Sequence, residues 1–145
     1  MLMEGWYPCI PGWHHDDVPR SREDKQPNYD TPEYFAEHRM CTIGNSAMTQ
    51  FINVDTELDE VKLGSTVYGV WNKEVEKKYA DTKNIYTVSS GEVVDFDWQD
   101  FHRGVAAEKR CWRFFIRASR GGHGKFANEI RNQVQTYLKD PEAGW

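Results

Sequence analysis

The spacing of apolar and polar residues predicts a chain built mainly from short strands. Five stretches are rich in β-branched and aromatic residues, and several of them alternate in polarity: 47–54, 65–71, 84–88, 92–96 and 111–119. The sequence Ser-Ser-Gly at 89–91 predicts a turn between two of them. The polar residues 72–83 predict a turn or a short helix. Short strands separated by turn signals are typical of a β-sandwich or barrel, and a jelly roll of about eight strands fits this pattern.

Two other segments predict helices. Residues 31–40 begin with Thr31 as N-cap and Pro32 in the first helical position, so we expect a short helix near 31–40, with His38 exposed on it. The polar, proline-rich residues 19–33 predict a long loop. Nearer the C-terminus, five apolar residues follow helical spacing up to Pro141 and predict an amphipathic helix packed outside a sheet: Phe126, Ile130, Val134, Tyr137 and Leu138.

Composition narrows the class of protein. A chain of 145 residues with 39% hydrophobic residues suits one folded domain, 1–145. The mean hydropathy of −0.80 and the lack of a long apolar run predict no membrane segment. The N-terminal residues lack a signal-peptide pattern, and the three cysteines are widely spaced without a CxxC, so we expect a cytoplasmic protein.

The charge is uneven along the chain. The net charge of −5 makes general binding to nucleic acid unlikely. Residues 101–125 are nevertheless strongly basic, with Glu108 as their single acid. This segment is either a solvated surface or a site for an anion, such as a phosphorylated or nucleotide-like small molecule.

The stretch GWHHDDVPR, residues 12–20, is the first candidate for chemistry. On a strand, residues two apart share a face, so His14 pairs with Asp16 and His15 pairs with Asp17. Either pair offers an imidazole and a carboxylate to a metal ion. A third ligand must come from elsewhere in the chain.

His102 is the best candidate for that third ligand, since it lies between two predicted strands. On the second of them, Arg113 and Arg117 share a face with Phe115. An arginine in so apolar a strand either faces solvent or reaches a cavity and binds a carboxylate. Two histidines and one carboxylate on one side of a metal are the ligand set of non-haem Fe(II) oxygenases.

With these residues in place, the chain resembles the Fe(II)/2-oxoglutarate-dependent dioxygenases, whose core is a double-stranded β-helix (a jelly roll). The motif is HxD, a distant His, and an Arg on the last core strand. The local match is to the phytanoyl-CoA hydroxylase-like branch, where the first motif often reads WHxD; here it is WHHD, Trp13 to Asp16. That favours His14 and Asp16 over the neighbouring pair. The spacing from His102 selects Arg113 over Arg110 and Arg117.

The resemblance implies an enzyme that hydroxylates a small-molecule substrate with dioxygen. His14, Asp16 and His102 would hold Fe(II), and 2-oxoglutarate would chelate the iron and pair its far carboxylate with Arg113. Further expected contacts are Thr49 and Gln50 with the cosubstrate, and Arg117 with its other end or with an anionic substrate.

Two alternatives stay open. One is a cupin-like jelly roll that binds metal without 2-oxoglutarate. The other is a non-catalytic β-domain that acts in binding or assembly, with residues 14–17 as a polar turn. Only 13 residues precede His14, fewer than the family usually has before this motif. Three explanations are open: the chain is a minimal version of the fold, it completes its sheet by pairing with a second copy in a homo-oligomer, or it is a remnant without activity.

Overall fold

The computed structural model describes residues 1–19, 23, 28, 35–59, 67–121 and 137–138. Within these residues the chain is mainly β. Its elements are, in order, β1 (Trp6–Tyr7), β2 (Ala36–Gly44), β3 (Thr49–Ile52), α1 (Val67–Lys78), the 3-10 helix η1 (Thr82–Asn84), β4 (Ile85–Thr87), β5 (Val93–Asp97), β6 (His102–Gly104), β7 (Arg113–Gly121) and β8 (Tyr137–Leu138).

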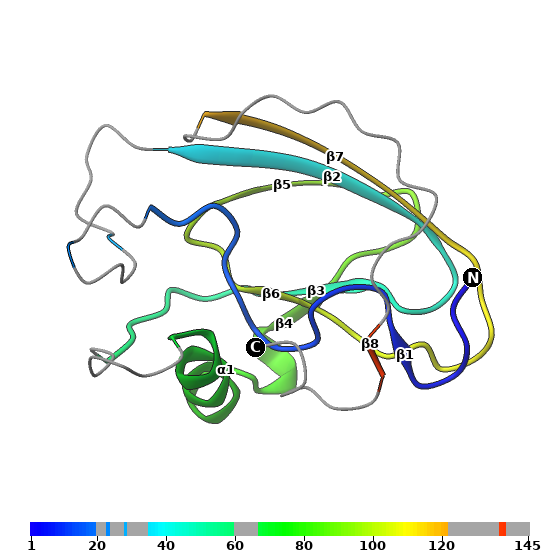
Figure 1. Cartoon of the computed structure of the whole chain (residues 1–145), viewed down its shortest axis with the longest axis horizontal. Coiled ribbons are helices and arrows are strands. Elements are labelled where there is room, and N and C mark those ends of the chain that lie inside the picture. Colours follow the sequence, from blue (N-terminus) through cyan, green and yellow to red (C-terminus); the bar gives the residue numbers. More distant parts are fainter. Residues whose placement is uncertain (20–22, 24–27, 29–34, 60–66, 122–136, 139–145) are drawn as a thin grey trace.

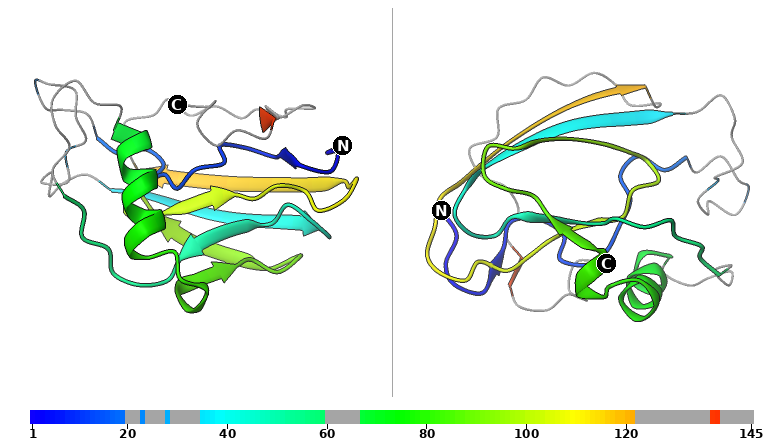
Figure 2. Two further views of the ribbon diagram at one scale, coloured as in Figure 1. Left: turned by 90° about the horizontal axis from the view of Figure 1, so that it is seen from below. Right: turned by 180° about the vertical axis from the view of Figure 1, so that it is seen from behind.

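Two antiparallel sheets of three strands form two layers, seen along their edges in Figures 1 and 2. One sheet has the order β5-β2-β7, and the other has the order β4-β3-β6. The chain passes repeatedly between them: β2 lies in the first, β3 and β4 in the second, β5 in the first, β6 in the second and β7 in the first. A small separate pair joins β1 to β8.

Apolar side chains from both sheets meet between the layers. Met40 from β2 and Phe96 from β5 pack with Phe51 from β3 and with Val88. The rings of Phe51 and Phe96 lie 5.2 Å apart between centroids. This contact follows from the period of two along each strand, which directs alternate residues of β2 and β3 inward.

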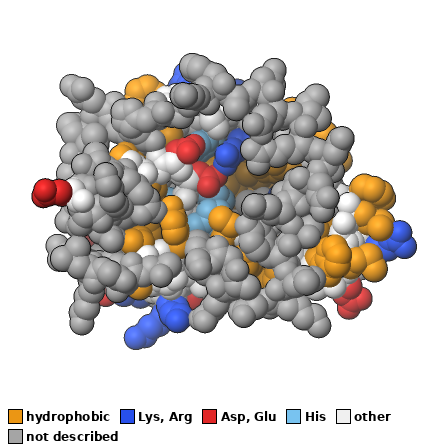
Figure 3. All heavy atoms as spheres, in the orientation of Figure 1, with side chains coloured by type: hydrophobic (Ala, Val, Ile, Leu, Met, Phe, Trp, Pro, Cys, Tyr) orange, Lys and Arg blue, Asp and Glu red, His pale blue; other side chains and the backbone are white. Residues whose placement is uncertain are grey.

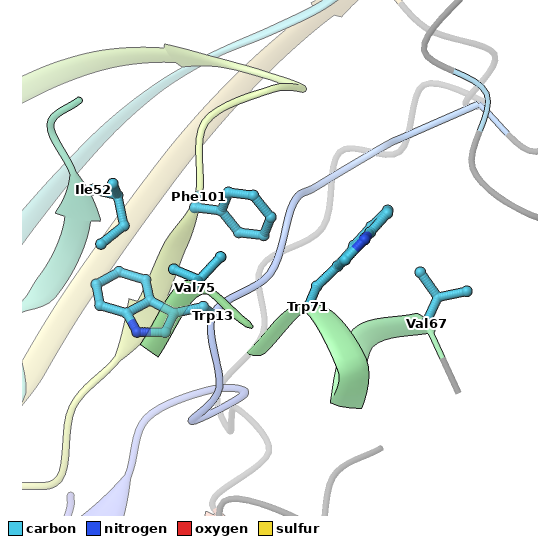
Figure 4. Close-up of a cluster of buried hydrophobic side chains, with 6 residues drawn as sticks. All are labelled: Trp13, Ile52, Val67, Trp71, Val75 and Phe101. Carbon is cyan, nitrogen blue, oxygen red and sulfur yellow. The ribbon is translucent and has the colours of Figure 1, made fainter. Parts of the chain in front are cut away.

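Helix α1 packs against the second layer, at the bottom of Figure 1, and makes a second core. Its residues at positions i, i+4 and i+8 are buried: Val67, Trp71 and Val75. Figure 4 shows these side chains together with Trp13, Ile52 and Phe101. The helix therefore packs against Trp13, the residue that directly precedes His14.

The pattern predicted some elements correctly and others wrongly. The strands expected within 47–54, 84–88, 92–96 and 111–119 are confirmed as β3, β4, β5 and β7. The strand expected at 65–71 is wrong at its described residues, which begin α1. The β-branched and aromatic residues of this run favour a strand, but the stripe Val67, Trp71, Val75 has helical spacing and continues into the polar residues that follow.

The prediction of a helix near 31–40 is also wrong for the residues of that range that the structure describes, 35–40. Residues 36–40 belong to β2, which pairs with β5 on one side and β7 on the other. Two ladders of backbone hydrogen bonds outweigh the local capping signal. His38, expected to be exposed, is 2% exposed on the inner face of this strand.

Most of the expected C-terminal helix lies outside the described residues, as does His123. Its last two apolar residues are described: Tyr137 and Leu138 form strand β8, paired with Tyr7 and Trp6, so the helix does not extend over them. Among the described residues, no helix is long and apolar enough to cross a membrane.

Candidate metal centre

The two histidines of the motif meet because their backbones pair. The amide N of His14 donates to the carbonyl of His102, and the amide N of His102 donates to the carbonyl of His14, both at 3.0 Å. This bridge adds the His14 segment to the free edge of β6. The two imidazole rings then lie 4.4 Å apart between centroids.

The same atom of each ring is left to bind a metal. His14 Nδ1 lies 2.7 Å from the carbonyl oxygen of Gly12, and His102 Nδ1 lies 3.1 Å from that of Asp100. A carbonyl only accepts hydrogen bonds, so each Nδ1 carries a proton, and each Nε2 is the ring nitrogen left for a metal. This is how metal-binding histidines are commonly oriented by a second hydrogen bond.

Asp16 completes the group. Its Oδ2 lies 3.4 Å from His102 Nε2 and also accepts a hydrogen bond from Arg117 Nη1 of β7. Burial alone would raise the pKa of Asp16, but the hydrogen bond and charge of His102 and the charge of Arg117 outweigh it and lower that pKa. The carboxylate is thus ionised, as a metal ligand must be.

The electrostatics keep His14 neutral. Burial, and secondarily the neighbouring His102, lowers the pKa of His14 to about 4. One potential ligand atom from each of His14, Asp16 and His102 lies within 4.8 Å of the others. Two imidazoles and one carboxylate form a ligand set for a divalent transition metal ion such as Fe(II).

The neighbouring pair points elsewhere. His15 turns into the core behind the strand, where its ring stacks 3.7 Å from that of Phe101 between centroids. Asp17 has a left-handed backbone, φ 56°, and its Oδ2 lies 3.6 Å from His38 Nε2. The structure therefore brings together His14 and Asp16, the pair favoured by the sequence motif.

Arg113 reaches the space between the sheets from β7. Its Nη2 donates to the hydroxyl oxygen of Thr49 at 3.0 Å and, at 3.4 Å, to that of Thr42. Its Nε is buried and has no hydrogen-bond partner among the residues that the structure describes. Burial lowers the pKa of Arg113, and no carboxylate of the described residues forms an ion pair with it.

The two other residues expected to contact the cosubstrate, Thr49 and Gln50, lie on opposite faces of β3. Thr49 faces inward and contacts Arg113, as the expected role requires. Gln50 faces outward, where it donates to the Thr87 hydroxyl and accepts from Arg103 Nε. The structure does not bring Gln50 to the other candidate residues.

The basic side chains that suggested an anionic substrate are already paired. Arg117 is bonded to Asp16, and Arg120 of β7 is bonded to Glu37 of β2. Arg110 donates to the sulfur of Met1 at 2.9 Å. Arg113 differs from these three arginines in being half-buried without a carboxylate partner among the described residues.

Two inward residues of β2 were missed. His38 accepts or donates a hydrogen bond with Ser119 Oγ at 2.8 Å, and Thr42 is fully buried beside Arg113. The signal was present in the period-two series Ala36, His38, Met40, Thr42, which the helix prediction obscured. Figure 3 shows acidic, basic and histidine side chains gathered at the hollowed centre of one face.

No protein-family model, no curated protein and no solved structure matches this chain at a significant level.

Proposed function

We propose that this protein is an Fe(II)/2-oxoglutarate-dependent oxygenase that hydroxylates a small-molecule substrate. His14, Asp16 and His102 would hold the iron, and Arg113 would bind the far carboxylate of 2-oxoglutarate. The observation that carries the proposal is a half-buried arginine without a described carboxylate partner on β7, in the layer opposite the strand of His102, together with a group of two histidines and an aspartate.

The ligand set supports the metal part of the proposal. Two histidines and one carboxylate leave several coordination positions of an octahedral ion for other ligands, which suits iron chemistry with a cosubstrate and dioxygen. Both imidazoles already have their Nδ1 bound to a carbonyl. The group thus requires little rearrangement to take up an ion.

Arg113 supports the cosubstrate part. A buried guanidinium is costly without an anion, and a carboxylate can accept two parallel hydrogen bonds from it. Arg113 contacts Thr49, which stands two residues from Phe51, and Phe51 pairs with His102. Two strand residues span ~7 Å, a separation that suits a short dicarboxylate bound at both ends.

The arrangement of strands supports the proposed fold, a double-stranded β-helix. In a double-stranded β-helix, successive strands lie in alternate layers. From β2 to β7 the chain changes layer at every step except that from β3 to β4, which lie in one sheet. The segment with His14 lies beside β6, so that the two histidines share one edge of a layer.

Bound iron and 2-oxoglutarate would supply the oxidising chemistry, in which dioxygen is reduced, 2-oxoglutarate loses carbon dioxide to give succinate, and the substrate gains a hydroxyl group. The chain's own residues would bind and orient. Thr42 and Thr49 fix the Arg113 guanidinium, Arg117 holds the Asp16 carboxylate, and Phe51 and Phe96 exclude water beside His102.

The test is the visible charge-transfer band that Fe(II) gives when 2-oxoglutarate chelates it without oxygen. We expect the band in the parent, its loss in His102→Ala, and at least tenfold weaker 2-oxoglutarate binding in Arg113→Gln, because one charge-assisted pair is worth ~1.5–3 kcal/mol. Arg110→Gln is the matched control, since it removes an arginine whose described contact is Met1.

The outcomes separate the candidate functions. A parent that binds Fe(II) but gives no band with 2-oxoglutarate would favour the cupin-like metal protein. A parent that binds neither would favour the non-catalytic binding domain.

A further inference from the structure

Two residues that adjoin the proposed metal ligands meet at one carboxylate oxygen. Trp13 directly precedes His14, and its indole Nε1 donates to Glu76 Oε2 at 2.7 Å. Arg103 directly follows His102, and its Nη1 donates to the same oxygen at 3.0 Å. Glu76 belongs to α1, so one helix side chain connects the segment that carries His14 to strand β6, which carries His102.

Further contacts close this arrangement into a network. The backbone N of Trp13 donates to Asn72 Oδ1 of the same helix at 2.8 Å. The Arg103 guanidinium carbon lies 4.3 Å from the centroid of the Trp13 ring, a cation–π contact. Arg103 Nε donates to Gln50 Oε1 of β3 at 3.0 Å.

Burial makes the connection matter. Trp13 is 0% exposed, and the side chain of Arg103 is 23% exposed. Without Glu76, the buried indole N–H would lack its acceptor, and Trp13 and Arg103 would lose the group that holds them together.

We propose that Glu76 is a positioning residue of the metal centre. It acts through Trp13 and Arg103 to fix the separation of His14 and His102 before an ion binds. This inference rests on the proposed metal-binding function. Partners of this kind, one step removed from the metal, commonly change metal affinity 10–100-fold when they are lost.

The experiment measures the affinity of the full-length chain for Co(II), which has a visible spectrum in place of iron. Glu76→Ala removes the acceptor, and Glu76→Gln keeps an acceptor oxygen but no charge. Glu74→Ala is the matched control: Glu74 lies on the same helix and binds Lys78 Nζ at 2.6 Å and the backbone N of Asp59 at 2.8 Å, away from both histidine strands.

We expect Glu76→Ala to weaken Co(II) binding on the order of tenfold and to alter the visible spectrum of bound Co(II). Glu76→Gln should show a smaller loss, and Glu74→Ala should bind like the parent. All variants are measured at a temperature where circular dichroism shows them folded. A carboxylate that merely stabilised α1 would lower the melting temperature and leave the affinity of the folded protein unchanged.

A double-mutant cycle tests the route of the effect. Trp13→Phe keeps a ring beneath Arg103 but removes the indole donor. Because Glu76→Ala already breaks the Trp13–Glu76 hydrogen bond, the double variant Trp13→Phe/Glu76→Ala should bind Co(II) no more weakly than Glu76→Ala alone. The inference is overturned if Glu76→Ala and Glu74→Ala bind equally well, or if the two effects add fully. A parent that does not bind Co(II) overturns the proposed function as well.

Discussion

His15 is buried against an aromatic ring and should make the stability of the protein depend on pH. Burial lowers the pKa of His15 to about 3, and the pKa of His14 is lowered to about 4. In the unfolded chain both should titrate near ~6.5. As the pH falls below that value, the unfolded state takes up protons that the folded state does not, so stability is full above pH ~6.5 and is lost toward pH 4.

His14 and His15 together should contribute up to about 2.7 kcal/mol per pH unit to the slope of the unfolding free energy of the metal-free protein. His38, whose pKa burial also lowers, adds to this slope. Urea denaturation at several pH values between 7 and 4.5 measures it. His15→Phe keeps an aromatic ring and should lower the slope by up to about 1.4 kcal/mol per pH unit. An unchanged slope in this variant would show that His15 does not titrate on unfolding.

The residues at the site differ in how far the sequence could predict them. His102 can be singled out because few histidines exist, and an arginine in the apolar strand 111–119 requires an explanation. The choice of His14 and Asp16 over the neighbouring pair, and of Arg113 over Arg110 and Arg117, follows from the resemblance to the dioxygenase motif. Gln50 was not separated from Thr49, because a one-residue difference along a strand reverses the face and the register could not be known beforehand.

At the scale of elements, Gly104 determines how closely the N-terminal segment approaches β6. A Cβ at this position would lie 2.6 Å from Cys9 Sγ and 3.4 Å from a carbon of the Pro8 ring. The segment that leads to His14 therefore depends on the absence of a side chain here.

We expect Gly104→Ala to lower the unfolding free energy by ~1–3 kcal/mol, the usual cost of overpacking, and to weaken metal binding by moving the His14 segment. Gly69→Ala is the control, because a Cβ there meets no atom within 4 Å. Urea denaturation and Co(II) titration of both variants check this. Equal behaviour of the two variants would contradict the expectation.

The sequence predicted strands better than helices, for a physical reason. β3, β4, β5 and β7 have β-branched and aromatic residues bounded by turns, which is a local signal. β2 contains Glu37 and Arg39 on its outer face and a capping pattern before it, so its strand conformation depends on partners distant in the chain. Helix α1 has mixed polarity in its second half, and its buried stripe becomes recognisable only across the whole element.

At the scale of the whole molecule, a bound ion would connect parts of the chain that are far apart in sequence. Co(II) at a free concentration 100 times its dissociation constant should stabilise the folded state by about 2.7 kcal/mol. For a chain of this size that is a rise in melting temperature on the order of 10 °C.

Thermal denaturation with and without Co(II) measures this rise, which should vanish in His102→Ala. His123→Ala is a control for adventitious binding to another histidine of the chain. A rise that persists without His102 would place the stabilising ion elsewhere.

The pairing of His14 with His102 also has a consequence for synthesis in the cell. A ribosome adds ~5–20 residues per second, so the second histidine is made on the order of 10 seconds after the first. Until β6 has been translated and has left the ribosome, the nascent chain offers only His14 and Asp16 of the three ligands. If these three residues bind an ion, loading would follow translation of most of the chain and would depend on the ion supply that the protein then meets.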